Sequence, residues 1–276
     1  MSENNPDSHY AILQETLRPI DVMKLGEVIS DIRSIPLADA SRLARHAYGI
    51  LDENVPSRQA YRMKSILDAM DIPVFLVPMS HLKPYPTPIP TRNADCLESH
   101  FNVELLDGCV EEIPWDDVRL VSCGTLIIQM KKRPLQPGED GMYASMEKIF
   151  PRMRMTNKVP RVQLGVSRTK VLEKLLVRIL CHNPTRSFQI DKDEFNFDYL
   201  GSRKAMNTIP NMTSFLKDLT NHSPNILLGQ NVVTFLNGDL REVQKFHAMT
   251  DFDEYNQWLF HWCERPPYPT DPMGSD

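Results

Sequence analysis

The fold is decided by residues 10–77, which read YAILQETLRPIDVMKLGEVISDIRSIPLADASRLARHAYGILDENVPSRQAYRMKSILDAMDIPVFLV. The stretch opens with a short apolar run at 10–13 and closes with another at 74–77, and both runs have the length of buried strands. Between them, apolar residues recur at helical spacing in three successive segments. The pattern predicts a small β-α-α-α-β domain over residues 9–79.

Three apolar stripes define the expected helices of this domain. The first stripe consists of Val22, Leu25, Val28, Ile29 and Ile32. The second lies in a helix over 37–46 and consists of Ala40, Leu43, Ala44 and Ala47. The third consists of Ala60, Met63, Ile66, Leu67 and Met70. Each stripe should face the sheet, because residues three and four apart share one face of a helix.

The ends of these helices carry recognisable capping residues. Asp21 can accept hydrogen bonds from the N–H groups of the first turn, and Ser57 could do the same for the third helix. Gly49 is expected at the C-terminal cap of the second helix, because glycine accepts positive φ. The caps therefore support three separate helices.

The rest of the chain predicts a second, mainly antiparallel β domain over 98–264, so the fold class is α+β. A proline-rich linker is expected at 80–97, a long loop at 134–160, and polar or proline-rich tails at 1–8 and 265–276. Strands are expected at 103–106, 118–121 and 125–130, with turns at 107–108 and 123–124. Residues 172–181 fit a helix by their spacing, but Asn183-Pro184 and the run at 187–190 favour two strands of a hairpin. Helices are expected at 213–221 and at 251–263, the second of which closes the domain.

Composition excludes several classes of protein. The 276 residues are 41% hydrophobic and 24% charged, which is ordinary for a globular protein that folds in water. A net charge of −5 counts against a surface devoted to nucleic acid. No apolar run approaches the roughly 18 residues of a membrane span, and residues 1–8 lack the pattern of a secretory signal. The five cysteines are odd in number and widely spaced, as in proteins whose cysteines remain reduced and form no disulfide framework. These features predict a cytoplasmic location.

Residues 10–78 resemble the C-terminal domain of the bacterial ribosomal stalk protein, and more weakly the adaptor of Clp-type proteases. The resemblance is carried by the helix ending VISDI at 28–32, by IPLADASRL at 35–43, and by the helix and strand at 60–77. Where that family contacts translation factors through lysines, this chain has Glu27, Ala38 and Ser41. The resemblance implies a compact platform that binds another protein. The second domain is only vaguely similar to a pleckstrin-type module.

Motifs of catalysis are missing from the sequence. It contains no Gly-x-Ser-x-Gly and no Gly-x-x-x-x-Gly-Lys-Ser/Thr, and cysteine and histidine do not form the tight pairs of a zinc site. We therefore expect no catalytic residues, no metal and no cofactor, and a protein that is not an enzyme. An enzyme whose site is scattered across the second domain remains one alternative.

The residues predicted to bind a partner lie mostly in a basic stretch. Between 131 and 178 there are twelve Lys or Arg against four Asp or Glu. Such a concentration of charge could contact an acidic protein, RNA or anionic lipid. Aromatic residues for base stacking are few there, which counts against nucleic acid. The predicted partner-binding residues are Lys131, Lys132, Arg133, Arg152, Arg154, Lys158, Arg161 and, as a possible aromatic anchor, Trp115.

Together these patterns predict a non-enzymatic protein–protein interaction module, an accessory or assembly subunit of a larger cytosolic complex. The partner would be another protein, a large protein complex or a second copy of the chain. An RNA- or ribosome-associated binding protein is the other alternative.

Overall fold

Residues 9–16, 20–105, 107–130 and 170–264 are described in the computed structural model of the chain. The chain divides into two units, residues 1–126 with 174–276 and residues 127–173. The first unit contains nearly all the described elements, including both regions for which the sequence predicts separate domains. Helices, antiparallel strand pairs and a C-terminal helix make the fold α+β, as predicted.

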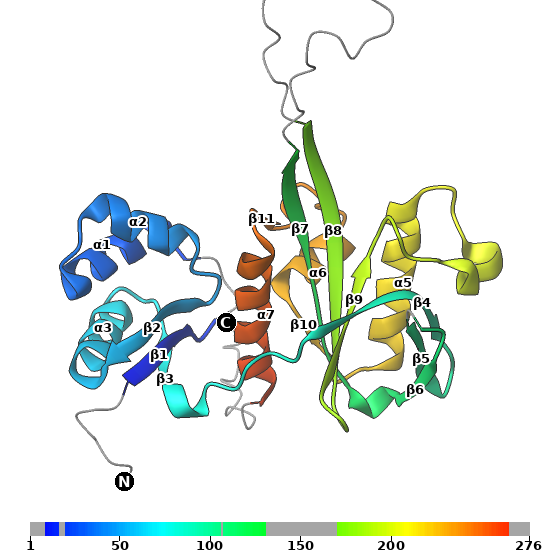
Figure 1. Ribbon diagram of the computed structural model, residues 1–276, viewed down its shortest axis with the longest axis horizontal. Coiled ribbons are helices and arrows are strands. Elements are labelled where there is room, and N and C mark those ends of the chain that lie inside the picture. Colours follow the sequence, from blue (N-terminus) through cyan, green and yellow to red (C-terminus); the bar gives the residue numbers. More distant parts are fainter. Residues whose placement is uncertain (1–8, 17–19, 106, 131–169, 265–276) are drawn as a thin grey trace, which may run out of the picture. The chain divides into compact units, whose positions relative to one another are not determined.

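The N-terminal region is a three-stranded antiparallel sheet of order β2-β1-β3 with three helices (Figure 1). Its elements are β1 (His9–Gln14), α1 (Val22–Arg33), α2 (Leu37–Arg45), β2 (Ile50–Pro56), α3 (Ser57–Ala69) and β3 (Val74–Pro78). The predicted order lacked β2. This strand reads ILDENVP, and its Asp, Glu and Asn are depleted in strands, so the pattern gave no strand signal.

Strand β1 is buried on both faces. Tyr10 and Ile12 point into a cluster with the buried sides of α1, α2 and α3. Ala11 and Leu13 point the other way, into a cluster with the C-terminal helix. Successive side chains of a strand alternate between faces, so one six-residue strand supplies the core on both sides of its sheet.

The helix ends agree only in part with the predicted caps. Asp21 Oδ1 accepts from the N–H of Met23 at 2.9 Å, which confirms the first cap. The Ser57 cap is wrong, because Pro56 stands at the N-cap of α3 and Ser57 is its first helical residue. Helix α2 ends at Arg45, so Gly49, with φ +95°, lies beyond its C-terminal cap. The positive φ of Gly49 therefore does not serve to cap helix α2.

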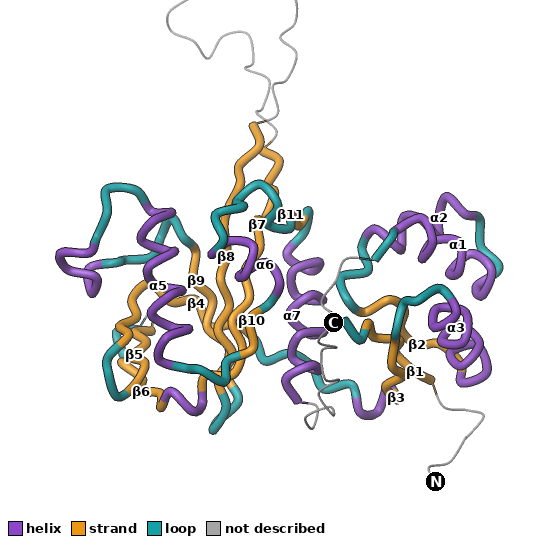
Figure 2. The backbone as a smooth tube through the Cα atoms, turned by 180° about the vertical axis from the view of Figure 1, so that it is seen from behind, coloured by secondary structure: helices purple, strands orange, loops and turns teal. Residues whose placement is uncertain are grey.

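The second region is an eight-stranded mixed sheet of order β10-β7-β8-β9-β4-β5-β6, with β11 beside β7 (Figure 2). Its strands are β4 (Pro88–Cys96), β5 (His100–Leu105), β6 (Val110–Pro114), β7 (Val118–Met130), β8 (Lys170–Cys181), β9 (Arg186–Asp191), β10 (Leu227–Leu228) and β11 (Lys245–Phe246). The helices are α5 (Thr208–His222), α6 (Gln230–Leu236) and α7 (Met249–Glu264), with 3-10 turns η1 (Met79–His81), η2 (Trp115–Asp117) and η3 (Asp198–Arg203).

Several expectations for this region hold, and others need correction. The hairpin β8–β9 and the helices α5 and α7 are confirmed. The predicted linker at 80–97 is wrong from Pro88 onward, because β4 pairs there with both β5 and β9. The predicted turn at 123–124 is also wrong, since β7 runs through it unbroken. Strand β6, helix α6 and the two short strands β10 and β11 were not predicted. The expected loop 134–160 and tails 1–8 and 265–276 lie outside the described residues.

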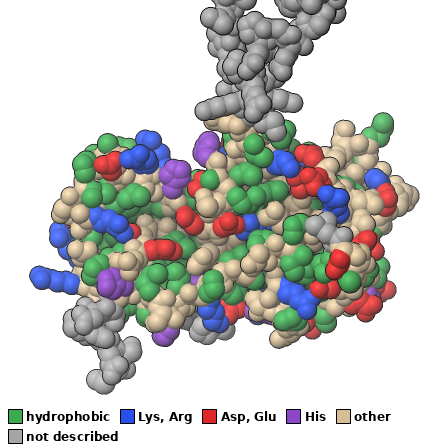
Figure 3. Space-filling model, viewed as in Figure 1, with side chains coloured by type: hydrophobic (Ala, Val, Ile, Leu, Met, Phe, Trp, Pro, Cys, Tyr) green, Lys and Arg blue, Asp and Glu red, His purple; other side chains and the backbone are tan. Residues whose placement is uncertain are grey.

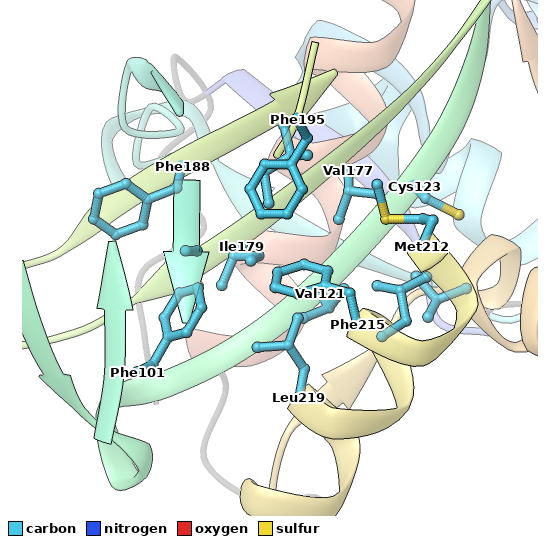
Figure 4. Close-up of a cluster of buried hydrophobic side chains, with 14 of the residues drawn as sticks. Phe101, Val121, Cys123, Val177, Ile179, Phe188, Phe195, Met212, Phe215 and Leu219 are labelled. Atoms are coloured by element: carbon cyan, nitrogen blue, oxygen red, sulfur yellow. The ribbon is translucent and has the colours of Figure 1, made fainter. Parts of the chain in front are cut away.

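The main core lies between the curled sheet and α5. In Figure 4, Phe215 and Leu219 of α5 face Phe101, Val121 and Ile179 of the sheet. All five side chains are buried. Apolar burial of this kind is worth about 25 cal/mol per Å² and is the main force that holds the sheet and the helix together.

Helix α7 packs between the two sheets, in a third apolar cluster (Figures 1 and 2). The cluster takes Leu176 and Leu180 from β8 together with the residues of β1 named above. Trp258 Nε1 donates to the backbone oxygen of Gln14 at 2.9 Å, and Trp262 Nε1 approaches the same oxygen at 3.3 Å. The last helix of the chain is therefore fixed to its first strand.

A buried arginine interrupts the apolar face of β8 toward α7. The side chain of Arg178 is 2% exposed and pairs with Asp253 of α7, and its Nε and Nη2 donate to Gln189 Oε1 at 3.1 and 3.0 Å. The guanidinium lies 4.7 Å from the ring centre of Phe252 and 5.6 Å from that of Tyr85. A buried charge needs such partners, because its desolvation costs several kcal/mol.

Candidate interaction surface

The predicted partner-binding residues fall into two groups in the structure. All seven basic residues lie outside the described residues: Lys131, Lys132, Arg133, Arg152, Arg154, Lys158 and Arg161. Trp115 is described and stands at the start of η2. Of the predicted set, the structure therefore places this tryptophan alone.

Trp115 packs within the chain. Its side chain is buried, and its Nε1 donates to the backbone oxygen of Leu97 at 3.0 Å. The indole stacks on His222 at 4.8 Å between ring centres and also contacts Phe101 at 5.7 Å. Because these contacts occupy the ring, little of it is left to anchor a partner.

Helices α1 and α2 form a hairpin whose inner contacts are close. A Cβ built on Gly26 would lie 3.0 Å from Ser41 Oγ and 3.1 Å from its Cα, so a larger residue would have to push the two helices apart by a few tenths of an ångström. Ser30 Oγ donates to the backbone oxygen of Ile35 at 2.7 Å and ties the turn to α1. These contacts hold the two helices of the hairpin in a fixed arrangement. Such preorganisation lowers the entropic cost of binding.

The outer side of this hairpin carries exposed apolar side chains. Leu43 is 48% exposed, Leu37 44% and Met23 53%. The sequence predicted Leu43 to be buried, and that is wrong: the buried arc of α2 is Ala40, Ser41 and Ala44. Figure 3 shows hydrophobic atoms interleaved with charged ones over α1 and α2. Apolar residues that a helical stripe assigns to the core but that face water often mark a binding surface.

A shallow cavity lies at the turn of the hairpin. It has a volume of about 440 Å³ and is lined by Arg33, Ile35, Glu53, Asn54, Val55, Pro56 and Gln59. These residues come from the end of α1, the turn, strand β2 and the start of α3. Leu37 follows the turn directly. The cavity could take a partner's side chain beside the turn that leads to Leu37.

Charges around this cavity are paired at one wall. Arg33 forms two hydrogen bonds with the Asp52 carboxylate, one of them Nε to Oδ2 at 2.8 Å, and also donates to the backbone oxygen of Glu53 at 3.1 Å. Burial raises the pKa of Asp52 even beside this arginine. Burial, and then the charge of Asp52, raise the pKa of Glu53. This side of the cavity therefore carries the Arg33–Asp52 ion pair next to the partly desolvated carboxylate of Glu53.

The cysteines show no sign of an activated thiol. Burial raises the pKa of Cys96 and of Cys263 to about 12, and raises that of Cys123 and of Cys181 still further. Because the thiolate is the nucleophile, these four side chains are unreactive near neutral pH. Cys109 is exposed, and Asp107 beside it raises its pKa.

Among the described residues, no group of three or more His, Cys, Asp or Glu side chains is arranged to hold a metal ion. No helix in this described part of the chain is both long and apolar enough to cross a membrane. No protein-family model matches the chain, and comparison with curated proteins and with solved structures also finds no match. The resemblance to the ribosomal stalk protein stays a prediction.

Proposed function

We propose that the chain is a non-enzymatic, protein-binding subunit of a larger cytosolic complex, and that it binds its partner through the α1–α2 hairpin. The observation that carries the proposal is the exposure of Leu37 and Leu43 on a helix whose Ala40 and Ala44 are buried. Each leucine, if covered by a partner, would contribute roughly 1–2 kcal/mol.

The surroundings of the two leucines support this role. The neighbouring hairpin turn has a cavity of about 440 Å³ with polar groups at its rim, which suits one anchoring side chain of a partner. Arg42 pairs with Asp39 on the same helix at 2.6 Å, so charged groups also surround the apolar residues. An apolar centre with a polar rim is the usual anatomy of a protein interface.

The raised pKa values of the buried Cys123 and Cys181 and of the partly buried Cys96 and Cys263 add support, because they remove four candidate nucleophiles. The experiment that tests the proposal is purification from native cells in mild salt, followed by mass spectrometry of the material that elutes at large size. Recovery of one protein in fixed stoichiometry, or of a defined homo-oligomer, supports the proposal. A lone monomer in every extract contradicts it.

A further inference from the structure

One methionine of the second region lies fully in the solvent. Met206, in the segment between η3 and α5, is 104% exposed, which is as open as in an extended chain. The most exposed of the other large apolar side chains that the structure describes, Val110, is 60% exposed. Single exposed apolar side chains are common and need no explanation as such. The difference here is chemical, because the side chain of Met206 carries a thioether sulfur.

The backbone around Met206 is held in place. Asn211 of α5, which is buried, fixes the preceding residue: its Oδ1 accepts from the N–H of Ala205 at 2.6 Å, and its Nδ2 donates to the oxygen of Ala205 at 3.0 Å. The following residue, Asn207, is the N-cap of α5. The exposure of Met206 is therefore a property of the folded loop and requires no local unfolding. A reagent in the solvent can reach the sulfur while the protein stays folded.

The other methionines whose side chains are described are less exposed. Met212 of the same helix α5 and Met63 of α3 are completely buried in apolar clusters. Met23 is 53% exposed and Met249 is 37% exposed. Met206 and Met212 thus form an internal comparison, because they are close in the chain and opposite in burial.

A peroxide oxidises a thioether in one two-electron step. The sulfur lone pair attacks one oxygen of hydrogen peroxide, an S–O bond forms as the O–O bond breaks, and the second oxygen takes up the proton of the first and leaves as water. The thioether becomes a sulfoxide and the peroxide is reduced. The peroxide must reach the sulfur, so the rate follows the exposure of the side chain. A sulfoxide is polar and disrupts a packed core, but at an exposed position its oxygen contacts water.

We propose that Met206 is a site of reversible modification: hydrogen peroxide or an organic hydroperoxide converts it to the sulfoxide, and a methionine sulfoxide reductase converts it back. In the second step two thiols of the reductase become a disulfide, and the sulfoxide oxygen leaves as water. The reductase must enclose the side chain in its active site, which a fully exposed residue on a folded loop allows. Met206 lies outside the α1–α2 hairpin, so the inference does not depend on the proposed function.

Peptide mapping tests the oxidation step. The full-length protein is treated with hydrogen peroxide, samples are quenched with catalase at intervals, and the sulfoxide at each methionine is measured by mass spectrometry. We expect Met206 to be oxidised at least about tenfold faster than Met212 and at least about twofold faster than Met23. Oxidation of Met206 that is no faster than that of either residue would overturn the proposal.

Reduction and thermal unfolding test the reversal. Protein oxidised mainly at Met206 is treated with the two reductases that act on the two sulfoxide epimers, with dithiothreitol as the source of thiols. We expect removal of at least about nine-tenths of the sulfoxide, and the same Tm for the natural, oxidised and reduced forms. Sulfoxide at Met206 that both reductases leave in place would overturn the proposal. So would a fall in Tm on oxidation that Met206→Leu prevents, because the side chain would then be packed.

Discussion

Gly49 lies directly against the indole ring of Trp258: a Cβ on Gly49 would come within 2.0 Å of ring atom Cδ2. The same tryptophan donates its Nε1 hydrogen to the backbone oxygen of Gln14 at 2.9 Å, and the backbone N–H of Gln14 donates to Gly49 O at 2.8 Å. One ring thus contacts two neighbouring strand ends of the small sheet. Gly49 is required by this contact and by its φ of +95°, and it does not cap a helix.

Gly49→Ala should therefore destabilise the protein strongly. The positive φ alone costs a non-glycine residue about 1 kcal/mol, and the clash with Trp258 should raise the total to at least about 3 kcal/mol. Gly238→Ala is the matched control, because Gly238 has φ +88° and open space around its Cβ. Urea denaturation of both variants measures the difference. Equal losses of unfolding free energy would mean that Gly49 and Trp258 are not in contact.

Replacing Arg178 by an apolar side chain of similar size should destabilise the protein less than truncating it to alanine. Arg178→Ala removes the hydrogen bonds to Gln189 and leaves a void, so we expect a loss of about 2–4 kcal/mol. Arg178→Met fills the space without a charge and should cost at least about 1 kcal/mol less. Asp253→Asn should also destabilise the protein, by about 1–3 kcal/mol, because it leaves the buried charge of Arg178 without its anionic partner. Chemical denaturation of the three variants would refute this ranking if methionine proved worse than alanine.

Glu53→Gln should stabilise the protein near neutral pH. Burial and the charge of Asp52 raise the pKa of Glu53 in the folded state, so folding is penalised once this carboxylate is ionised. The penalty is present above the raised pKa and vanishes as pH falls below the ordinary range of glutamate. Because Glu53 is partly solvated, we expect a Tm increase of up to about 2 °C at pH 7 and almost none near pH 4.

Thermal unfolding of the Glu53→Gln variant across that pH range measures this effect. The control is Glu27→Gln, which removes an exposed glutamate of α1. A Tm difference that stays constant between pH 4 and pH 7 would show that ionisation of Glu53 is not its source.

The basic segment should strengthen partner binding in a salt-dependent way. Replacing Lys131, Lys132, Arg133, Arg152 and Arg154 by Glu should weaken association with the partner by about tenfold or more at low salt, and by less at high salt. Binding of the natural and altered chains is measured over a series of salt concentrations. Recovery of RNA whose affinity falls with salt with a steep log–log slope would instead favour the nucleic-acid alternative.

Part of the fold could be predicted because local signals and burial agree. The stripe Leu25, Val28, Ile29 and Ile32 is buried as its spacing predicts, and Asp21 caps its helix. Strand β2 was missed because polar residues follow Ile50 and Leu51, and its pairing with β1 is a tertiary effect. The local sequence of a strand does not indicate which other strand will pair with it.

Gly124 illustrates a second kind of failure. The pair 123–124 predicts a turn, yet β7 continues through it, and a Cβ on Gly124 would lie 2.3 Å from the ring of Phe246. The glycine is there for close approach of a distant aromatic side chain, which spacing alone does not show.

The candidate site was less predictable than the fold. Leu43 lies one helical turn beyond Ala40, at the border of the buried arc, so its pattern suits core and surface equally. Its exposure depends on how α2 is rotated against α1, which is set by the close contact of Gly26 with Ser41. The predicted basic residues lie outside the described residues, so their role stays a prediction.

The most direct test of the protein-binding role compares partner recovery by the natural chain and by Leu37→Ser/Leu43→Ser, each purified from native cells and quantified by mass spectrometry. Val233→Ser is the matched control, because Val233 is an exposed apolar residue of another helix. The account predicts at least a tenfold loss for the double variant, about 1.4 kcal/mol, with unchanged circular dichroism and normal recovery for the control. Undiminished recovery by the double variant would contradict it.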